Sequence, residues 1–198
     1  MPFIAFLGCD GSGKSSVIQV VSKQLVAKGV PVTLCHWRPK PFDSNDNAGI
    51  LTASVPHGTS PRGQLASMAK LLWLGLNWWI GWLRGLNTAS RRGILIFDRY
   101  HGDLLVDPRR YRYGASLAVA RLVTRFMPQP DLVLFLDASP DVLLARKQEV
   151  PREELVRSRH GYLELCKSCS RFRVIDAELP ISKVIENVLA EISETSFR

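Results

Sequence analysis

The stretch "FLGCDGSGKSS", residues 6–16, places three glycines and one lysine directly behind a short apolar run. It fits the pattern G-x-x-x-x-G-K-[ST] from Gly8 to Ser15, between a predicted strand and a predicted helix. Glycines in such a loop let successive backbone N–H groups point at phosphate oxygens, and the helix behind it presents its positive end to the same anion. The stretch therefore predicts a phosphate-binding loop for a nucleoside triphosphate.

Two side chains of this loop have distinct expected tasks. Lys14 should reach the β and γ phosphates, and the Ser15 hydroxyl should ligate Mg²⁺. The alternative is a glycine-rich turn with an exposed lysine, but the motif and its position between strand and helix disfavour it. We expect the nucleotide to contact Gly8, Asp10, Gly11, Ser12, Gly13, Lys14, Ser15 and Ser16.

Apolar runs of strand length alternate with helical patterns along the chain. This alternation predicts an α/β fold with a parallel sheet covered on both faces and ligands at the carboxyl ends of the strands. The segment 38–63 has no clear periodicity and is expected to be a substrate-facing loop within a single domain, 1–198. The expected strands are 3–7, 31–37, 93–98, 131–137 and 172–176, and the expected helices are 17–27, 62–90, 115–126, 140–149, 153–169 and 181–194.

The composition is that of a globular protein with a basic balance. The 198 residues include 26 Lys and Arg against 18 Asp and Glu, a net charge of +8, which suits an anionic partner. The N-terminal residues carry no secretory signal pattern, so we expect a cytoplasmic protein. Four cysteines are too few for a disulfide framework, and Cys166 and Cys169, without a second pair, are interpreted as ordinary thiols.

A second candidate site follows the apolar run "ILIFD". Asp98 could hold the Mg²⁺ shell or orient the attacking oxygen, and Arg99 could clamp the negative charge of an acceptor. The alternative is an aspartate that caps a turn and an arginine in a surface ion pair. The chain lacks the Asn-Lys-x-Asp motif of GTPases and is small for a motor ATPase. These features together favour a kinase.

The order and spacing of four motifs resemble the thymidylate kinase family of P-loop kinases. The resemblance implies a three-layer P-loop kinase fold, ATP with Mg²⁺, and phosphoryl transfer to a small acceptor such as thymidine monophosphate. It also implies that Asp10 faces the acceptor and that Asp98 and Arg99 form the Asp-Arg motif of the family. The motifs are "GCDGSGKSS" (8–16), "ILIFDRY" (94–100), "PDLVLFLDASPDVLLAR" (130–146) and "YLEL" (162–165).

The resemblance further implies a short lid over ATP around residues 146–159. Family members without an arginine at the loop position that Ser12 occupies draw a catalytic arginine from this lid. Arg152 is therefore the expected catalytic arginine, with Arg157 and Arg146 as alternatives, and Arg146 is expected to contact the nucleotide. A solvated charged helix is the simpler interpretation of each.

The sequence departs from the family at the acceptor side. Thymidylate kinases usually carry an Asp-Arg pair, whose arginine meets the monophosphate, in the helix before "ILIFDRY", whereas this chain has Asn77 and Trp78 there. After the Asp-Arg-Tyr it continues "HGDLLVDPRRYRYG" (101–114), whose charged and tyrosine side chains are expected to line a more charged acceptor site. They are Asp103, Asp107, Arg109, Arg110, Tyr111, Arg112 and Tyr113.

Four of the five tryptophans lie in the uncharged stretch 71–83, which is too short to cross a bilayer. So many tryptophans exceed what one helix of a small domain normally buries. We expect a homodimer contact through the Trp-rich helix 71–86, with peripheral membrane contact as the second interpretation.

Two alternatives to a monophosphate kinase stay open. One is a kinase of a hydroxyl on a nucleoside, sugar or other metabolite, for which Asp98 would help to remove the proton. The other is a nucleotide-regulated binding protein without efficient transfer. Nucleic-acid binding is disfavoured because the single "RRYRYG" stretch is too short for a stacking platform.

Overall fold

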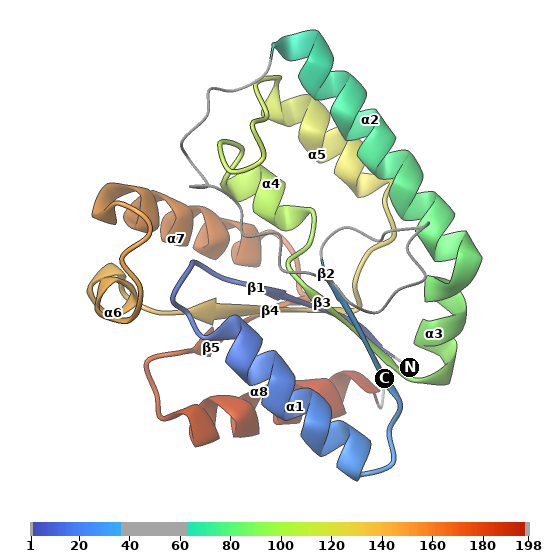
Figure 1. Cartoon of the computed structure of the whole chain (residues 1–198), viewed down its shortest axis with the longest axis vertical. Helices are drawn as coiled ribbons and strands as arrows, with labels where there is room; N and C mark the ends of the chain where they lie inside the picture. Colours follow the sequence, from blue (N-terminus) through green and yellow to red (C-terminus); the bar gives the residue numbers. More distant parts are fainter. Residues whose placement is uncertain (1, 37–62, 197–198) are drawn as a thin grey trace.

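A single parallel sheet forms the centre of the protein (Figure 1), whose computed structural model describes residues 2–36 and 63–196. Its five strands follow the spatial order β2-β3-β1-β4-β5. The parallel pairing confirms the sheet predicted from the apolar runs. The strands are β1 (Phe3–Leu7), β2 (Val32–His36), β3 (Ile94–Asp98), β4 (Leu132–Asp137) and β5 (Phe172–Asp176).

The helices form a layer on each face of the sheet. α1 and α8 cover one face, and α2, α4, α5 and α7 lie over the other, which confirms the three-layer α/β/α architecture (Figure 1). The helices are α1 (Lys14–Ala27), α2 (Gln64–Gly81), α3 (Asn87–Arg92), α4 (Gly102–Val106), α5 (Leu117–Arg125), α6 (Pro140–Arg146), α7 (Arg152–Lys167) and α8 (Ile181–Ser196).

The register of the inner strands sets the position of the site. β1 pairs with β3 so that Phe6 lies opposite Asp98, and with β4 so that Leu7 lies opposite Phe135. Because the strands are parallel, the loop after β1 and the residues after β3 emerge side by side at one edge of the sheet. The phosphate-binding loop and the Asp-Arg pair are therefore neighbours despite about 90 intervening residues.

Two helical features differ from the prediction. The single helix expected over 62–90 is interrupted by a π-helical turn, Trp82–Leu86, in which Gly85 has φ 174° and ψ −29°. α4 was not predicted, because five residues are too few to show a helical period. Residues 38–62 of the expected substrate-facing loop lie outside the described residues. Over the ranges that the structure describes, no helix has the length and apolar character needed to cross a bilayer.

The Trp-rich helix divides into a buried face and an exposed face. Trp78 is fully buried and packs against Phe97 and Tyr100, with ring centroids 4.8 Å away in each case. Trp73 and Leu76 on the same helix are 63% and 59% exposed. Trp78 therefore anchors α2 to the sheet, and the apolar residues of the other face remain uncovered in one copy of the chain.

Gly93 marks a close approach of two backbones at the start of β3, so its replacement tests the sheet. A Cβ atom there would lie 2.2 Å from the carbonyl oxygen of Pro31. We expect Gly93→Ala to lower the free energy of unfolding by about 1–3 kcal/mol, because backbone must shift to admit the methyl group. Urea denaturation monitored by circular dichroism measures this change. Gly85→Ala is the control, since nothing lies within 4 Å of its Cβ position; equal effects of the two variants would contradict the expectation.

Candidate functional site at the carboxyl ends of β1 and β3

The loop after β1 depends on glycine for its shape. Gly8 and Gly11 have φ values of 151° and 87°, a backbone conformation that residues other than glycine rarely adopt. A Cβ atom at Gly8 would also lie 2.9 Å from the carbonyl oxygen of Leu136, and one at Gly11 would lie 2.9 Å from that of Leu143. The loop is thus held against the end of β4 and against α6, and it leads directly into the first turn of α1.

Lys14 lies inside this loop. Its Nζ donates hydrogen bonds to the carbonyl oxygens of Gly8 (2.8 Å) and Cys9 (2.9 Å) and to the Ser12 hydroxyl (3.3 Å). Burial, with a contribution from Arg99, lowers the pKa of Lys14 to about 8. An anion next to the ammonium group would oppose both effects, because it favours the charged form. The loop therefore holds a buried cation at the N-terminus of a helix, an arrangement suited to phosphate.

Two arginines from distant parts of the chain converge on Asp10. Arg99 Nη2 lies 2.6 Å from Asp10 Oδ1, and Arg110 Nη1 lies 2.8 Å from Oδ2, with Arg110 Nη2 3.3 Å from Oδ1. Burial acts to raise the pKa of Asp10, but the two guanidinium groups lower it to about 2. Asp10 is therefore ionised at any pH at which the protein would work, and it holds the two cations together.

Arg99 is bound on its other side by Asp103, which is fully buried at the start of α4. Arg99 Nη1 donates to Asp103 Oδ2 (2.7 Å), and the hydroxyl of Tyr162 on α7 donates to Oδ1 (2.8 Å). Tyr111 donates a third, longer hydrogen bond of 3.3 Å. Burial raises the pKa of both tyrosines well above the usual range, so both remain donors. Asp103 thus supports Arg99 from behind and does not line an open site, contrary to the expectation from sequence.

Asp98 and Ser15 offer oxygen ligands at the same edge of the sheet. The Oδ1 atom of Asp98 is buried and has no hydrogen-bond partner among the residues that the structure describes. Ser15 is exposed in the first turn of α1. A carboxylate and a hydroxyl are ligands that Mg²⁺ accepts, and an unpartnered buried carboxylate oxygen is costly without one. These two residues therefore fit a magnesium ion.

The four arginines of the expected lid take different partners, and Arg157 pairs with Glu154 on its own helix. Arg152 pairs with Asp141 (3.1 Å), and both side chains are more than half exposed. Arg146 Nη1 donates to the carbonyl oxygen of Ala177 (3.0 Å). Arg159, which the sequence did not single out, forms a bidentate pair with Asp137 at the end of β4 (2.7 and 2.8 Å). The structure thus brings Lys14, Arg99 and Arg110 together at Asp10, and it holds Arg152 and Arg146 elsewhere.

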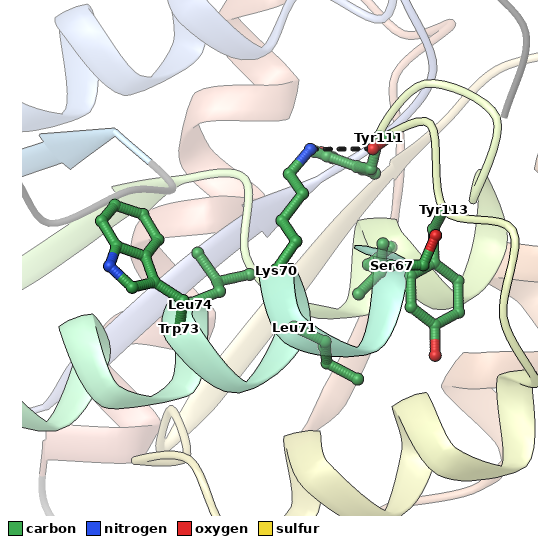
Figure 2. A pocket seen from close by; sticks show the side chains of 8 residues that line it. Ser67, Lys70, Leu71, Trp73, Leu74, Tyr111 and Tyr113 are labelled. Carbon is green, nitrogen blue, oxygen red and sulfur yellow. Dashed lines mark hydrogen bonds between the residues drawn. The ribbon is translucent and has the colours of Figure 1, made fainter. Parts of the chain in front are cut away.

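A small apolar hollow adjoins the charged cluster (Figure 2). Figure 2 shows the Lys70 side chain donating to the carbonyl oxygen of Tyr111, a hydrogen bond of 3.0 Å. The volume of the hollow, about 40 Å³, holds only a few water molecules in this conformation. Because the Tyr111 hydroxyl also donates to Asp103, this tyrosine joins the hollow to the cluster. The lining residues are Ser67, Lys70, Leu71, Trp73, Leu74, Leu104, Tyr111 and Tyr113.

Sequence reasoning named most of the cluster but missed some of its connections. The sequence analysis named Tyr162 only as part of the motif "YLEL". Nothing in the neighbouring sequence indicates that its hydroxyl contacts Asp103, 59 residues earlier. His36, which the sequence analysis did not name, ends β2 opposite Asp98. Its position at the carboxyl end of a strand is the one sequence feature that could have placed it near the site. Arg109, expected in the acceptor site, is exposed, in contrast to its neighbour Arg110.

The chain is similar over nearly its full length to thymidylate kinases. It is 26% identical to a probable thymidylate kinase of Sulfolobus acidocaldarius, over 94% of this chain and 93% of that protein. It is 28% identical to a thymidylate kinase of Prosthecochloris aestuarii, over 89% and 86% of the two chains. A thymidylate kinase of Dehalococcoides mccartyi is 26% identical over 96% and 95%. No family model matches the chain.

The buried pair of Arg99 and Asp103 has a matched counterpart in the exposed pair of Arg152 and Asp141. We expect Asp103→Asn to lower the free energy of unfolding by about 3 kcal/mol, because it leaves a buried guanidinium with one carboxylate partner in place of two. Asp141→Asn should cost less than about 1 kcal/mol, since its pair is screened by water. Thermal or urea unfolding of both variants measures the difference, and equal costs would contradict it.

Proposed function

We propose, from the similarity of the chain to thymidylate kinases over nearly its full length, that it is a phosphotransferase that transfers the γ-phosphoryl group of ATP to a nucleoside monophosphate, foremost thymidine monophosphate. The observation that carries the proposal is the meeting of two groups of cationic side chains at one edge of the sheet. Lys14 in its glycine loop is one, and the two arginines on Asp10 are the other. A donor and an acceptor that are both phosphorylated require such a pair.

On the donor side, the loop residues from Gly8 to Ser16 bind the triphosphate. Their backbone N–H groups and the N-terminus of α1 face its oxygens, and Lys14 neutralises charge on the β and γ phosphates. Ser15 and Asp98 would hold Mg²⁺, which supplies further neutralisation of charge on the transferring group. Catalysis then consists mainly of alignment and of electrostatic stabilisation by groups that are already in place.

On the acceptor side, Arg99 and Arg110 face the monophosphate beside Asp10. A phosphate oxygen is already anionic, so its attack needs no base. The ionised Asp10 keeps the two guanidinium groups in position, and Asp103 keeps Arg99 from turning away. This support favours an anionic acceptor over a neutral hydroxyl.

We further propose that residues 146–159, at the junction of α6 and α7, act as a lid within the single domain 1–198. For Arg152 to serve as the catalytic arginine it must leave Asp141, and for Arg146 to contact the nucleotide it must leave the carbonyl of Ala177. The first exchange is inexpensive because exposed ion pairs contribute little, and the second gives up one hydrogen bond to a backbone carbonyl.

A screen of phosphoryl acceptors tests the proposed reaction. With ATP and Mg²⁺, release of ADP should be fastest with thymidine monophosphate, slower with other nucleoside monophosphates, and near background with nucleosides and sugars. Lys14→Ala should lower the rate by about 100-fold or more, because it removes the cation closest to the transferring group. Lys23→Ala, on the exposed side of the same helix, is the control.

Two outcomes of this screen would contradict the proposal. Transfer only to a hydroxyl compound would favour the nucleoside or sugar kinase, with Asp98 as its base. Tight binding of ATP without transfer to any acceptor would favour a nucleotide-regulated binding protein.

We also propose that two copies of the chain associate through the exposed face of α2. Trp79 Nε1 donates to the carbonyl oxygen of Phe126 (3.0 Å), which joins this face to the end of α5. Phe126 and Leu122 are themselves 68% and 59% exposed. Exposed apolar residues on α2, on the turn after it and on α5 form the kind of surface that a partner usually covers, and a second copy can cover it symmetrically. Its exposed members are Leu65, Met68, Leu72, Trp73, Leu76, Trp79, Leu83, Leu122 and Phe126.

Sedimentation velocity tests this association. The unaltered chain should be dimeric at micromolar concentration, and Leu76→Lys should shift it to monomer, because the interface would bury an unpaired ammonium group. Val26→Lys is the control, since Val26 is equally exposed but lies on α1, in the other helical layer. A chain that is monomeric at every concentration would contradict the proposal, and binding to anionic vesicles would then favour the membrane interpretation.

A further inference from the structure

Helix α2 offers no cation to an acceptor at the position where thymidylate kinases carry one. Asn77 is buried and its Nδ2 donates to the carbonyl oxygen of Trp73 in its own helix (2.7 Å). Trp78 is fully buried against Phe97 and Tyr100. At Asn77 and Trp78 the helix therefore offers no cation to a monophosphate bound next to Arg99. Lys70, earlier on α2, donates instead to the carbonyl oxygen of Tyr111 (3.0 Å).

Arg110 occupies a rigid turn that directs its side chain at the loop after β1. The backbone N–H of Arg110 donates to Asp107 Oδ1 (3.2 Å), and that of Tyr113 donates to the carbonyl oxygen of Pro108 (2.9 Å). Arg112 adopts φ 53°, which closes the turn. With the turn held in this way, little side-chain freedom remains to be lost when the guanidinium binds an anion.

Arg110 is the most accessible charged group of the cluster. Its side chain is 23% exposed, against 12% for Asp10, 10% for Arg99 and 1% for Asp103. Its two Nη atoms share one carboxylate with Arg99, whereas its Nε has no hydrogen-bond partner among the described residues. Among the residues that the structure describes, Arg99 has a second carboxylate in Asp103, whereas Arg110 pairs with Asp10 alone. Within the described part of the chain, Arg110 thus combines the greatest exposure in the cluster with a donor, Nε, that no residue uses.

We infer that Arg110 determines acceptor specificity: it binds the anionic group of the acceptor and takes the place of the arginine that the family carries on the helix. The inference rests on the proposed function for the identity of the acceptor, thymidine monophosphate. A guanidinium fork can share its edges between Asp10 and a phosphate, and hydrogen bonds between charged groups are the strong ones. The same acceptor without its phosphate gains nothing from Arg110.

Equilibrium binding, which needs no turnover, tests this inference. Isothermal titration calorimetry gives the affinity of each variant for thymidine monophosphate and for thymidine. We expect Arg110→Gln to bind the monophosphate about 10- to 100-fold more weakly, as loss of one charged hydrogen-bonded contact requires, with thymidine unaffected. Arg110→Lys should retain part of the preference for phosphate, because it keeps the charge without the fork.

Arg109→Gln is the matched control, since it removes the same charge from the neighbouring, exposed position. Equal monophosphate affinities of Arg109→Gln and Arg110→Gln would overturn the inference. So would an unaltered protein that binds thymidine monophosphate no more tightly than thymidine. Should Arg110→Gln fail to fold, the comparison of Arg110→Lys with Arg109→Lys decides in the same way.

The calorimetric result and the acceptor screen can fail independently. Loss of phosphate preference in Arg110→Gln, in a protein that transfers nothing to any monophosphate, would support the inference and overturn the proposed reaction. If Arg110→Gln transfers phosphate to thymidine monophosphate with an unchanged KM, the proposed reaction is supported and the inference about Arg110 is overturned.

Discussion

The site depends on Arg99, whose guanidinium is held between two carboxylates. One is Asp10 in the loop after β1, and the other is Asp103 at the start of α4. Arg99 itself has φ 70°, a conformation that costs a non-glycine residue of order 1–3 kcal/mol and persists only where the surroundings enforce it. Its backbone N–H continues the sheet by donating to the carbonyl of Phe6 (2.9 Å). The strained residue is therefore fixed at both its backbone and its side chain.

This fixation links the layers of the fold to the chemistry. Tyr162 connects α7 to Asp103, and Tyr111 connects to Asp103 the turn that carries Arg110. Asp10, which pairs with both arginines, belongs to the loop that holds Lys14. Two arginines and two aspartates leave the cluster neutral, so its burial is tolerable without a ligand. Lys14 and the exposed edge of Arg110 are then the places where an added anion is favoured. Specific recognition thus comes from how the charges are paired, and the net charge of +8 contributes only a general attraction.

The sequence predicted the features that depend on neighbouring residues. Buried parallel strands are continuous apolar runs, and a phosphate loop needs its glycines in order, so the sheet and the loop could be predicted. The contact of Arg110 with Asp10 spans 100 residues and depends on how a short turn packs, which no local pattern encodes. The role of Tyr162 was missed for the same reason, whereas α4 was missed because five residues are too few to show a helical period. The sequence analysis assigned Asp103 to the acceptor site because it is a charged residue close to the Asp-Arg motif. In the structure Asp103 is fully buried and supports the side chain of Arg99 instead.

The apolar sequence of helix α2 supplies both a buried face that packs on the sheet and an exposed face. The uncharged stretch 71–83, of which 71–81 lie in α2, looks uniform, yet Trp78 is buried against the sheet, and Trp73 and Leu76 lie on the outside. Trp73 also lines the hollow beside Tyr111, whose hydroxyl reaches Asp103. A partner that covers the outer face would therefore contact Trp73, which lines the same hollow as Tyr111. Lys70 on α2 donates to the carbonyl oxygen of Tyr111, so the helix that carries this outer face also contacts the turn that carries Arg110.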